Sequence, residues 1–203
     1  MHHEVISLSD LQSLALPFWV RDRKILLRMA VEIAQIIFKR TKNPLGIVAL
    51  LLLAAGRRDM LLNLSRLLGT GHNGKRLQKL LSATEDSTSS KSRSTAHKNA
   101  FVLMSKGHFI TAAAVFLTPS PPFLTEATRL LVNRADEPTL AFLVSRCCEA
   151  PTYVVGTEND TAMNPAVPGK PSTSVDSLCL GPCTRRFLHE TLLPIYYPSS
   201  LSP

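Results

Sequence analysis

An almost unbroken apolar run from Leu45 to Ala55, interrupted only by Gly46, most constrains how this chain of 203 residues can fold. A helix that is apolar on every side must be buried by other elements. The run is far shorter than the roughly 18 to 20 residues that cross a bilayer, so it predicts a buried helix. Asn43 and Pro44 supply a cap and a first helical residue, and Gly56 supplies a left-handed stop.

Helical spacing recurs along the rest of the chain. Between Asp22 and Arg40 the apolar residues return at intervals of three and four, whereas no segment alternates as a strand does. Aromatic residues make up only 6% of the chain and leucine dominates its apolar runs, which favours helices packed by aliphatic side chains. Besides the apolar run, we predict an extended connection at 17–20 and helices at 9–14, 22–40, 59–68, 95–106, 108–117, 124–134, 138–149 and 182–192.

The predicted fold class is all-α, an α-hairpin array or solenoid-like arrangement of antiparallel helical pairs with short joints. A stretch dense in Ser and Thr, and a later one dense in Pro, read as disordered linkers because they have too little apolar surface to bury. The expected organisation is a basic helical region (1–83), a Ser-rich linker (84–94), helical hairpin pairs (95–150), a Pro-rich disordered linker (151–180), and a terminal helix with a tail (181–203).

Positive charge is concentrated in the first helical half. The chain has 23 Lys+Arg and 15 Asp+Glu, a net charge of +8. Residues 20–109 hold 17 Lys+Arg and 5 Asp+Glu, or +12, and the remainder carries −4. Such a surface suits an acidic protein or an acidic membrane surface. Nucleic acid is an unlikely partner, because the basic half has few aromatic residues for stacking and no recognisable reading helix.

Two glycine motifs match nucleotide-binding sequence patterns but lack the structural context that such sites need. Residues 69–74 satisfy GxGxxG and residues 69–75 satisfy GxxxxGK. A dinucleotide site needs a strand before the glycines, but the preceding residues read as a helix. A phosphate loop needs Ser or Thr after its lysine, and Arg76 stands there. We therefore expect no cofactor.

The sequence also contains no recognisable motif for catalysis or for metal binding. The histidines are scattered without a paired nucleophile or carboxylate, so we expect that the chain is not an enzyme. Adjacent Cys147 and Cys148 do not suit one metal ion, and Cys179 and Cys183 lack a second pair at zinc-site spacing. We expect reduced thiols, the adjacent pair on a helix. The first residues show no secretory signal, and an intracellular location is expected.

Several segments, in order, resemble a known family. The segment Phe18-Trp19-Val20-Arg21-Asp22 resembles a "WWVRN" signature, and the segment from His97 to Lys106 resembles "LKNAF.LLSK". On these residues the chain resembles the rabconnectin/DmX-like large subunit of the RAVE complex, in its C-terminal helical region. Further similar segments are Phe38–Lys42, Asn43–Leu45, Ala112–Leu117, Thr139–Arg146 and Phe187–Pro194.

The resemblance implies a non-catalytic scaffold or assembly factor for the vacuolar-type proton ATPase, which acidifies vacuoles and endosomes. It implies V-ATPase soluble-sector subunits and other RAVE subunits as partners, and a cytoplasmic location peripheral to endosomal or vacuolar membranes. Because that family's proteins are very large, we expect a fragment or reduced relative. A basic helical nucleic-acid-binding module and a coat or trafficking adaptor remain as alternatives.

The candidate partner-binding residues combine an aromatic anchor with basic side chains. Tryptophan and arginine are enriched among residues that dominate binding energy. Trp19 is nevertheless expected to pack into its own domain, and Lys98 to Phe101 are expected to form a helix cap with a core face. The predicted partner-binding residues are Trp19, Arg21, Arg23, Lys24, Arg57 and Arg58.

Overall fold

The structure is a computed structural model that describes residues 8–41, 45–67, 90–149 and 181–192. Every regular element in these ranges is helical, so the predicted all-α class is confirmed. The elements are α1 (Leu8–Ser13), α2 (Leu16–Trp19), α3 (Arg23–Arg40), α4 (Leu45–Ala54), α5 (Arg58–Leu67), α7 (Ser90–Ser105), α8 (Phe109–Phe116), α9 (Leu124–Asn133), α10 (Pro138–Cys148), α11 (Pro182–Phe187) and the π-helical segment η1 (Leu188–Leu192).

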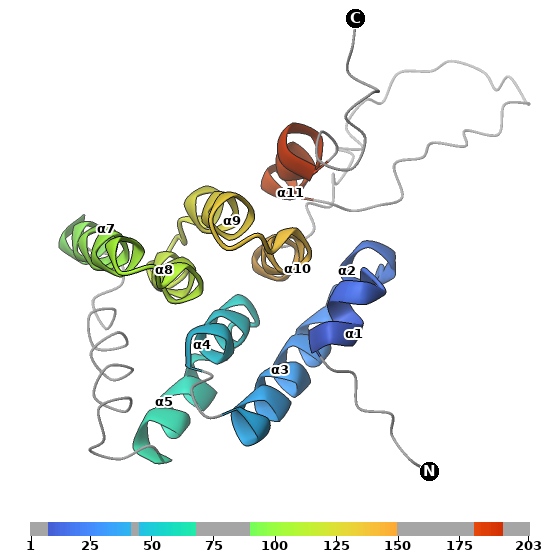
Figure 1. The fold of residues 1–203 in the computed structure, drawn as a ribbon, viewed down its shortest axis with the longest axis horizontal. Coiled ribbons are helices and arrows are strands. Elements are labelled where there is room, and N and C mark those ends of the chain that lie inside the picture. Colours follow the sequence, from blue (N-terminus) through green and yellow to red (C-terminus); the bar gives the residue numbers. More distant parts are fainter. Residues whose placement is uncertain (1–7, 42–44, 68–89, 150–180, 193–203) are drawn as a thin grey trace, which may run out of the picture.

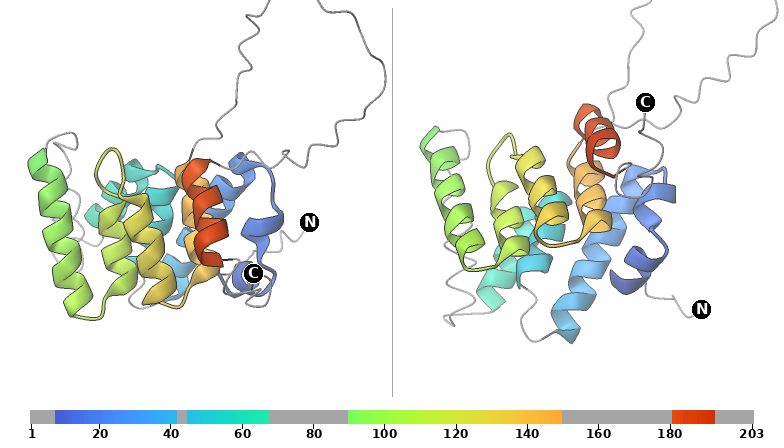
Figure 2. Two further views of the ribbon diagram at one scale, coloured as in Figure 1. Left: turned by 90° about the horizontal axis from the view of Figure 1, so that it is seen from above. Right: turned by 45° about the horizontal axis from the view of Figure 1, so that its top comes forward.

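The helices form two layers. Helices α7, α8, α9 and α10 lie side by side in chain order, and α11 covers α9 and α10 (Figures 1 and 2). Helices α3 and α4 form the second layer, in which α4 packs against α8 and α10, and α5 extends from α4. Consecutive helices thus pack in pairs. The solenoid arrangement stays a prediction.

Helix α4 lies at the centre of the core, as its composition predicts. All its residues from Val48 to Ala54 are buried, and Leu50 and Leu51 have no exposed surface. Burying a leucine side chain contributes about 1.5 to 3 kcal/mol, so this helix is a main source of stability. No helix in the described ranges is both long and apolar enough to cross a bilayer.

Most predicted helix ends are confirmed. Asp22 caps α3 by accepting a hydrogen bond from the backbone N–H of Lys24 at 2.8 Å. Gly56 and Gly107 adopt left-handed φ angles of 71° and 75° after α4 and α7. Pro138 lies in the first turn of α10. The predicted start at Asn43 and Pro44, the glycine motifs at 69–75, the Pro-rich linker 151–180 and Cys179 lie outside the described residues.

The predictions for residues 17–20 and for the end of the Ser-rich linker are wrong. Residues 17–20 do not form an extended connection, because Leu16–Trp19 make the short helix α2, with its proline in the first turn where the missing N–H costs no bond. The Ser-rich linker does not extend to residue 94, because α7 begins at Ser90. Ser92 is buried, and Arg93 lies 4.0 Å from the ring centre of Phe123, so contacts with α8 and the next turn order these residues.

The segment from Lys98 to Phe101 also differs from its prediction. It lies in the interior of α7, and the expected cap is wrong. Ala100 does face the core, but Phe101 is 61% exposed.

Candidate partner-binding surface

The connection between α2 and α3 is fixed by one buried arginine on α10. The guanidinium of Arg146 donates hydrogen bonds to three backbone carbonyl oxygens, those of Pro17 at 2.6 Å, Val20 at 2.5 Å and Arg21 at 3.1 Å. A planar guanidinium has five donors in a fixed fork, so one side chain can hold several carbonyls in one geometry. We call this arrangement the Arg146 clamp.

Apolar and helix-end contacts reinforce the clamp. The rings of Phe18 and Phe142 stack with centroids 4.2 Å apart. Arg23 Nη2 donates to the carbonyl oxygen of Cys147 at 2.6 Å, near the end of α10, where the helix dipole favours a cation. Helix α10 therefore holds the chain on both sides of the α2–α3 connection.

The electrostatics of the clamp follow from burial. Arg146 is only 9% exposed, and burial lowers its pKa, but an arginine in a protein still remains charged. Burial raises the pKa of the adjacent Cys147 and Cys148 thiols to about 12, so both are protonated at neutral pH. Both cysteines are free thiols on α10, as predicted. A protonated buried thiol is a poor nucleophile and a poor metal ligand.

Trp19 projects away from this anchored backbone. Its side chain is 77% exposed, so the expectation that it packs into its own domain is wrong. The reason is that its neighbour Phe18 takes the inward position on α10. Leu14 and Ile25 are also exposed, by 61% and 46%.

Exposed basic side chains follow Trp19 closely along the chain. Arg21, Lys24 and Arg28 are exposed, and Lys24, Ile25 and Arg28 share one face of the first two turns of α3. We refer to Trp19, Arg21, Lys24, Ile25 and Arg28 as the Trp19 surface.

The structure brings together only some of the predicted binding residues. Trp19, Arg21 and Lys24 belong to the Trp19 surface. Arg23 starts α3 but is half-buried against α10. Arg57 and Arg58 lie at the start of α5, at the other side of the molecule from α2 (Figure 1).

The two arginines at α5 are already engaged within the chain. Arg57 pairs with Asp59 at 3.4 Å, and this contact lowers the pKa of the Asp59 carboxyl group. Arg58 Nη2 donates to the carbonyl oxygen of Thr118. Their predicted role in partner binding stays a prediction, and nothing places them on the Trp19 surface.

Sequence reasoning missed Arg146, Arg28 and Ile25. The signal for Arg146 was present: it is the one charged residue in the stretch from Leu140 to Cys148, in which Ser145 is the only other polar residue. A cation on a helix that is buried along its length must find internal acceptors. Here the acceptors are carbonyls that the kinked α2–α3 connection leaves without helical partners.

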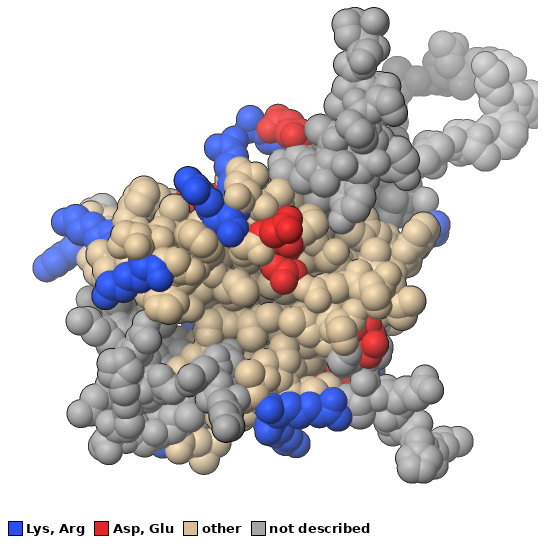
Figure 3. Space-filling model, viewed as in Figure 1, with Lys and Arg blue, Asp and Glu red and all other residues tan. Residues whose placement is uncertain are grey.

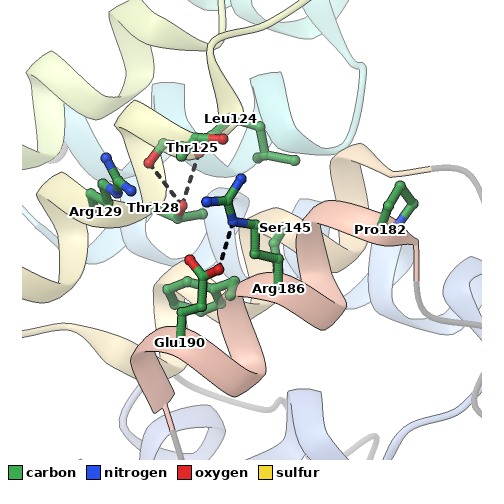
Figure 4. A pocket seen from close by; sticks show the side chains of 9 residues that line it. Leu124, Thr125, Thr128, Arg129, Ser145, Pro182, Arg186 and Glu190 are labelled. Carbon is green, nitrogen blue, oxygen red and sulfur yellow. Dashed lines mark hydrogen bonds and ion pairs between the residues drawn. The ribbon is translucent and has the colours of Figure 1, made fainter. Parts of the chain in front are cut away.

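A hollow of about 220 Å³ lies between α9, α10 and α11 (Figure 4). Arg186 pairs with Glu190, four residues further along the same helical segment, at 2.8 Å, and the hydroxyls of Thr128 and Ser145 donate to carbonyls of their own helices. Its polar groups are thus largely satisfied from within. Its lining residues are Leu124, Thr125, Thr128, Arg129, Ser145, Pro182, Arg186, Phe187 and Glu190.

On the face shown in Figure 3, Lys and Arg lie mostly towards the margins, and a group of Asp or Glu lies near the middle. Lys and Arg gather over the α7 end and over α3 at the lower edge. Among the described residues, no group of three or more His, Cys, Asp and Glu lies close enough to hold a metal ion. The arrangement offers binding contacts in the form of an exposed indole and exposed cations on a fixed backbone.

Comparison with known proteins gives one family. The family described as RAVE protein 1 C terminal matches residues 1–161, a range that includes the Trp19 surface, the Arg146 clamp and helices α1 to α10. No curated protein matches the chain. Since the match covers well over half of the sequence, the chain belongs to the family of RAVE protein 1 C-terminal regions.

Proposed function

We propose that this chain is a non-catalytic helical scaffold of the RAVE complex that takes part in assembly of the vacuolar-type proton ATPase. The observation that carries the proposal is the family match over residues 1–161. The proposed partners are other RAVE subunits and soluble-sector subunits of the ATPase. The proposed location is cytoplasmic, peripheral to endosomal or vacuolar membranes.

The geometry supports binding as the activity. The Arg146 clamp and the Phe18–Phe142 stack fix the backbone that presents Trp19, so the indole is displayed without a large loss of backbone entropy on binding. Exposed tryptophan and arginine side chains on a rigid element are typical of residues that dominate binding energy. The thiols of buried Cys147 and half-buried Cys148 are protonated, which argues against either as a catalytic nucleophile.

The test has two parts. The full chain is captured from lysate of its own cells at two salt concentrations, with nuclease added, and the bound proteins are identified by mass spectrometry. Recovery of RAVE subunits or ATPase soluble-sector subunits is expected, with reduced recovery for Trp19→Ala.

Loss of the chain from cells should then lower the share of the soluble sector that sediments with membranes and should weaken acidification of the compartment. The proposal is wrong if both quantities stay at the wild-type value. Capture of coat proteins alone would favour the trafficking-adaptor alternative, and binding that nuclease abolishes would favour a nucleic-acid-binding module.

A further inference from the structure

We propose that the Trp19 surface binds an acidic protein segment that carries an apolar residue. The inference rests on the proposed function in taking this surface as a partner contact, and goes beyond it in naming the chemistry of the partner. Its elements are one exposed indole, one exposed aliphatic side chain at Ile25, and three exposed cations within ten residues of chain.

The apolar part of the surface needs an apolar occupant. Trp19 is 77% exposed and Ile25 is 46% exposed, so a partner that covers both removes most of an indole and part of an isoleucine from water. Burial of apolar area is the main favourable term in protein association. A partner segment with charged residues alone would not bury this apolar area and would gain none of that free energy.

The charges on the surface call for an acidic occupant. Within the described part of the chain, the side chains of Arg21, Lys24 and Arg28 form no hydrogen bond or ion pair. Among the acidic residues nearby, the Asp22 carboxylate already accepts the capping bond from Lys24 N–H, and Glu32 lies one turn beyond Arg28. Carboxylates of a partner would thus meet cations that form no ion pair with any of the described residues.

The backbone beneath these side chains is fixed before binding. Arg21 itself is held by its carbonyl oxygen, which accepts from Arg146 Nη2 at 3.1 Å, and its side chain points to solvent. The start of α3 is fixed by the Asp22 cap and by Arg23 on the end of α10. Only side-chain rotamers remain to be ordered by a partner, which lowers the entropic cost of binding.

Other occupants fit less well. A second copy meeting this face by two-fold symmetry would place its own cations against the same cations. Recognition of anionic lipid is typical of clusters of four to eight Lys and Arg, and this surface presents three. An acidic protein segment satisfies both the apolar and the charged parts of the surface.

A photo-crosslinking experiment identifies the occupant. The residue p-benzoylphenylalanine is placed at position 25 of the full chain, which keeps Trp19 and the three cations, and a control chain carries it at position 101. Phe101 is 61% exposed on α7, on the opposite side of the molecule from α2 (Figure 1). After irradiation in cells, the crosslinked peptides are sequenced by mass spectrometry.

The expected result is a crosslink, specific to position 25, to a segment with a net negative charge and at least one large apolar residue. That segment is then synthesised, and its affinity for the purified chain is measured at two salt concentrations. Trp19→Ala should weaken binding by about 30-fold or more. The triple variant Arg21→Glu, Lys24→Glu, Arg28→Glu should weaken it by about 10- to 100-fold, and its affinity should no longer fall as the salt concentration rises.

A matched charge control is available on the same helix. Lys39→Glu with Arg40→Glu reverses two exposed cations at the far end of α3, about 20 Å along the helix, and should change the affinity by less than about threefold. Both reversal variants are checked for unchanged helix content by circular dichroism, so lost binding cannot reflect lost folding.

Several results would overturn the inference. These are a crosslinked segment that is neutral or basic, crosslinks to lipid only, no crosslink at position 25 beyond that at position 101, or a Trp19→Ala affinity within twofold of wild type. Capture of RAVE or ATPase subunits without a crosslink from position 25 would contradict this inference and leave the proposed function standing. A crosslink to an acidic segment of an unrelated protein would support the inference and contradict the proposed function.

Discussion

Replacing Arg146 by methionine removes the clamp while keeping an unbranched side chain in the core. The change leaves the carbonyl oxygens of buried Pro17 and half-buried Val20 without a donor, at about 1 to 3 kcal/mol each. The exposed Arg21 carbonyl regains water. Methionine also avoids the desolvation cost of a buried guanidinium, which offsets part of the loss. The expected net destabilisation is about 2 to 4 kcal/mol.

Thermal unfolding followed by circular dichroism measures this loss. For a chain of this length, about 2 to 4 kcal/mol corresponds to a fall in Tm of roughly 4 to 16 °C. Arg146→Lys should be intermediate, because an ammonium group keeps the charge but cannot reproduce the planar fork. Hydrogen exchange should rise first at the amides of residues 18–22, which the clamp holds.

Arg129→Met is the matched control. Arg129 is exposed on α9 and makes no side-chain hydrogen bond or ion pair within the described residues, so its loss should change stability by less than about 0.5 kcal/mol. If Arg146→Met unfolds within 1 °C of this control, the carbonyl bonds do not stabilise the fold and the reasoning fails.

Three further predictions concern the core, the thiols and the Trp19 surface. A Cβ at Gly46 would lie 2.6 Å from Thr111 Oγ1, so Gly46→Ala should lower the free energy of unfolding in urea by about 1 to 3 kcal/mol. In a chain that carries Thr111→Ala, the same substitution should cost much less. An equal cost with and without Thr111→Ala would contradict the contact. Folding raises the pKa of both α10 thiols from 9.0 to about 12, so the stabilisation that their protonated forms contribute is complete below pH 9 and is lost as the pH rises towards 12. In a variant with Cys179→Ser and Cys183→Ser, the remaining thiols of Cys147 and Cys148 should therefore not react with a thiol reagent at pH 8 until urea unfolds the chain. Reaction of both thiols in the folded chain would refute this prediction. Trp19 is the only tryptophan, and three exposed cations follow it within nine residues of chain. Relative to free tryptophan, iodide should therefore quench its emission more, and caesium less, than in an uncharged setting; quenching by both ions in the same ratio as for free tryptophan would show that the local potential is not positive.

The helices of the core were predictable because local signals and burial agree. The run from Leu45 to Ala55 has one physical solution, a buried helix, and the glycines at 56 and 107 mark real left-handed ends. The start of α7 was not predictable from composition. Ser90 to Ser94 resemble a linker, and only contacts such as Arg93 over the ring of Phe123, about thirty residues away, make them helical.

The Trp19 surface was predictable only in part, because it also depends on contacts between distant segments of the chain. A lone tryptophan in an apolar chain is usually buried, and the sequence does not reveal that Phe18 takes the place on Phe142 and leaves Trp19 outside. The predicted extended connection at 17–20 begins with Pro17, but proline is also favoured in a first helical turn, which is where the structure places it. Exposure of Trp19 is thus decided by a contact between segments more than a hundred residues apart.

The most direct test of the Trp19 surface uses the single tryptophan as a spectroscopic probe. Labelling the chain with 5-fluorotryptophan gives one ¹⁹F resonance, which unlabelled partners do not obscure. On titration with purified RAVE subunits or ATPase soluble sector, this resonance should shift and lose its sensitivity to exchange of H2O for D2O, because the indole leaves water. A complex that forms, by co-elution, while the resonance keeps its position and its solvent sensitivity would contradict partner binding at Trp19.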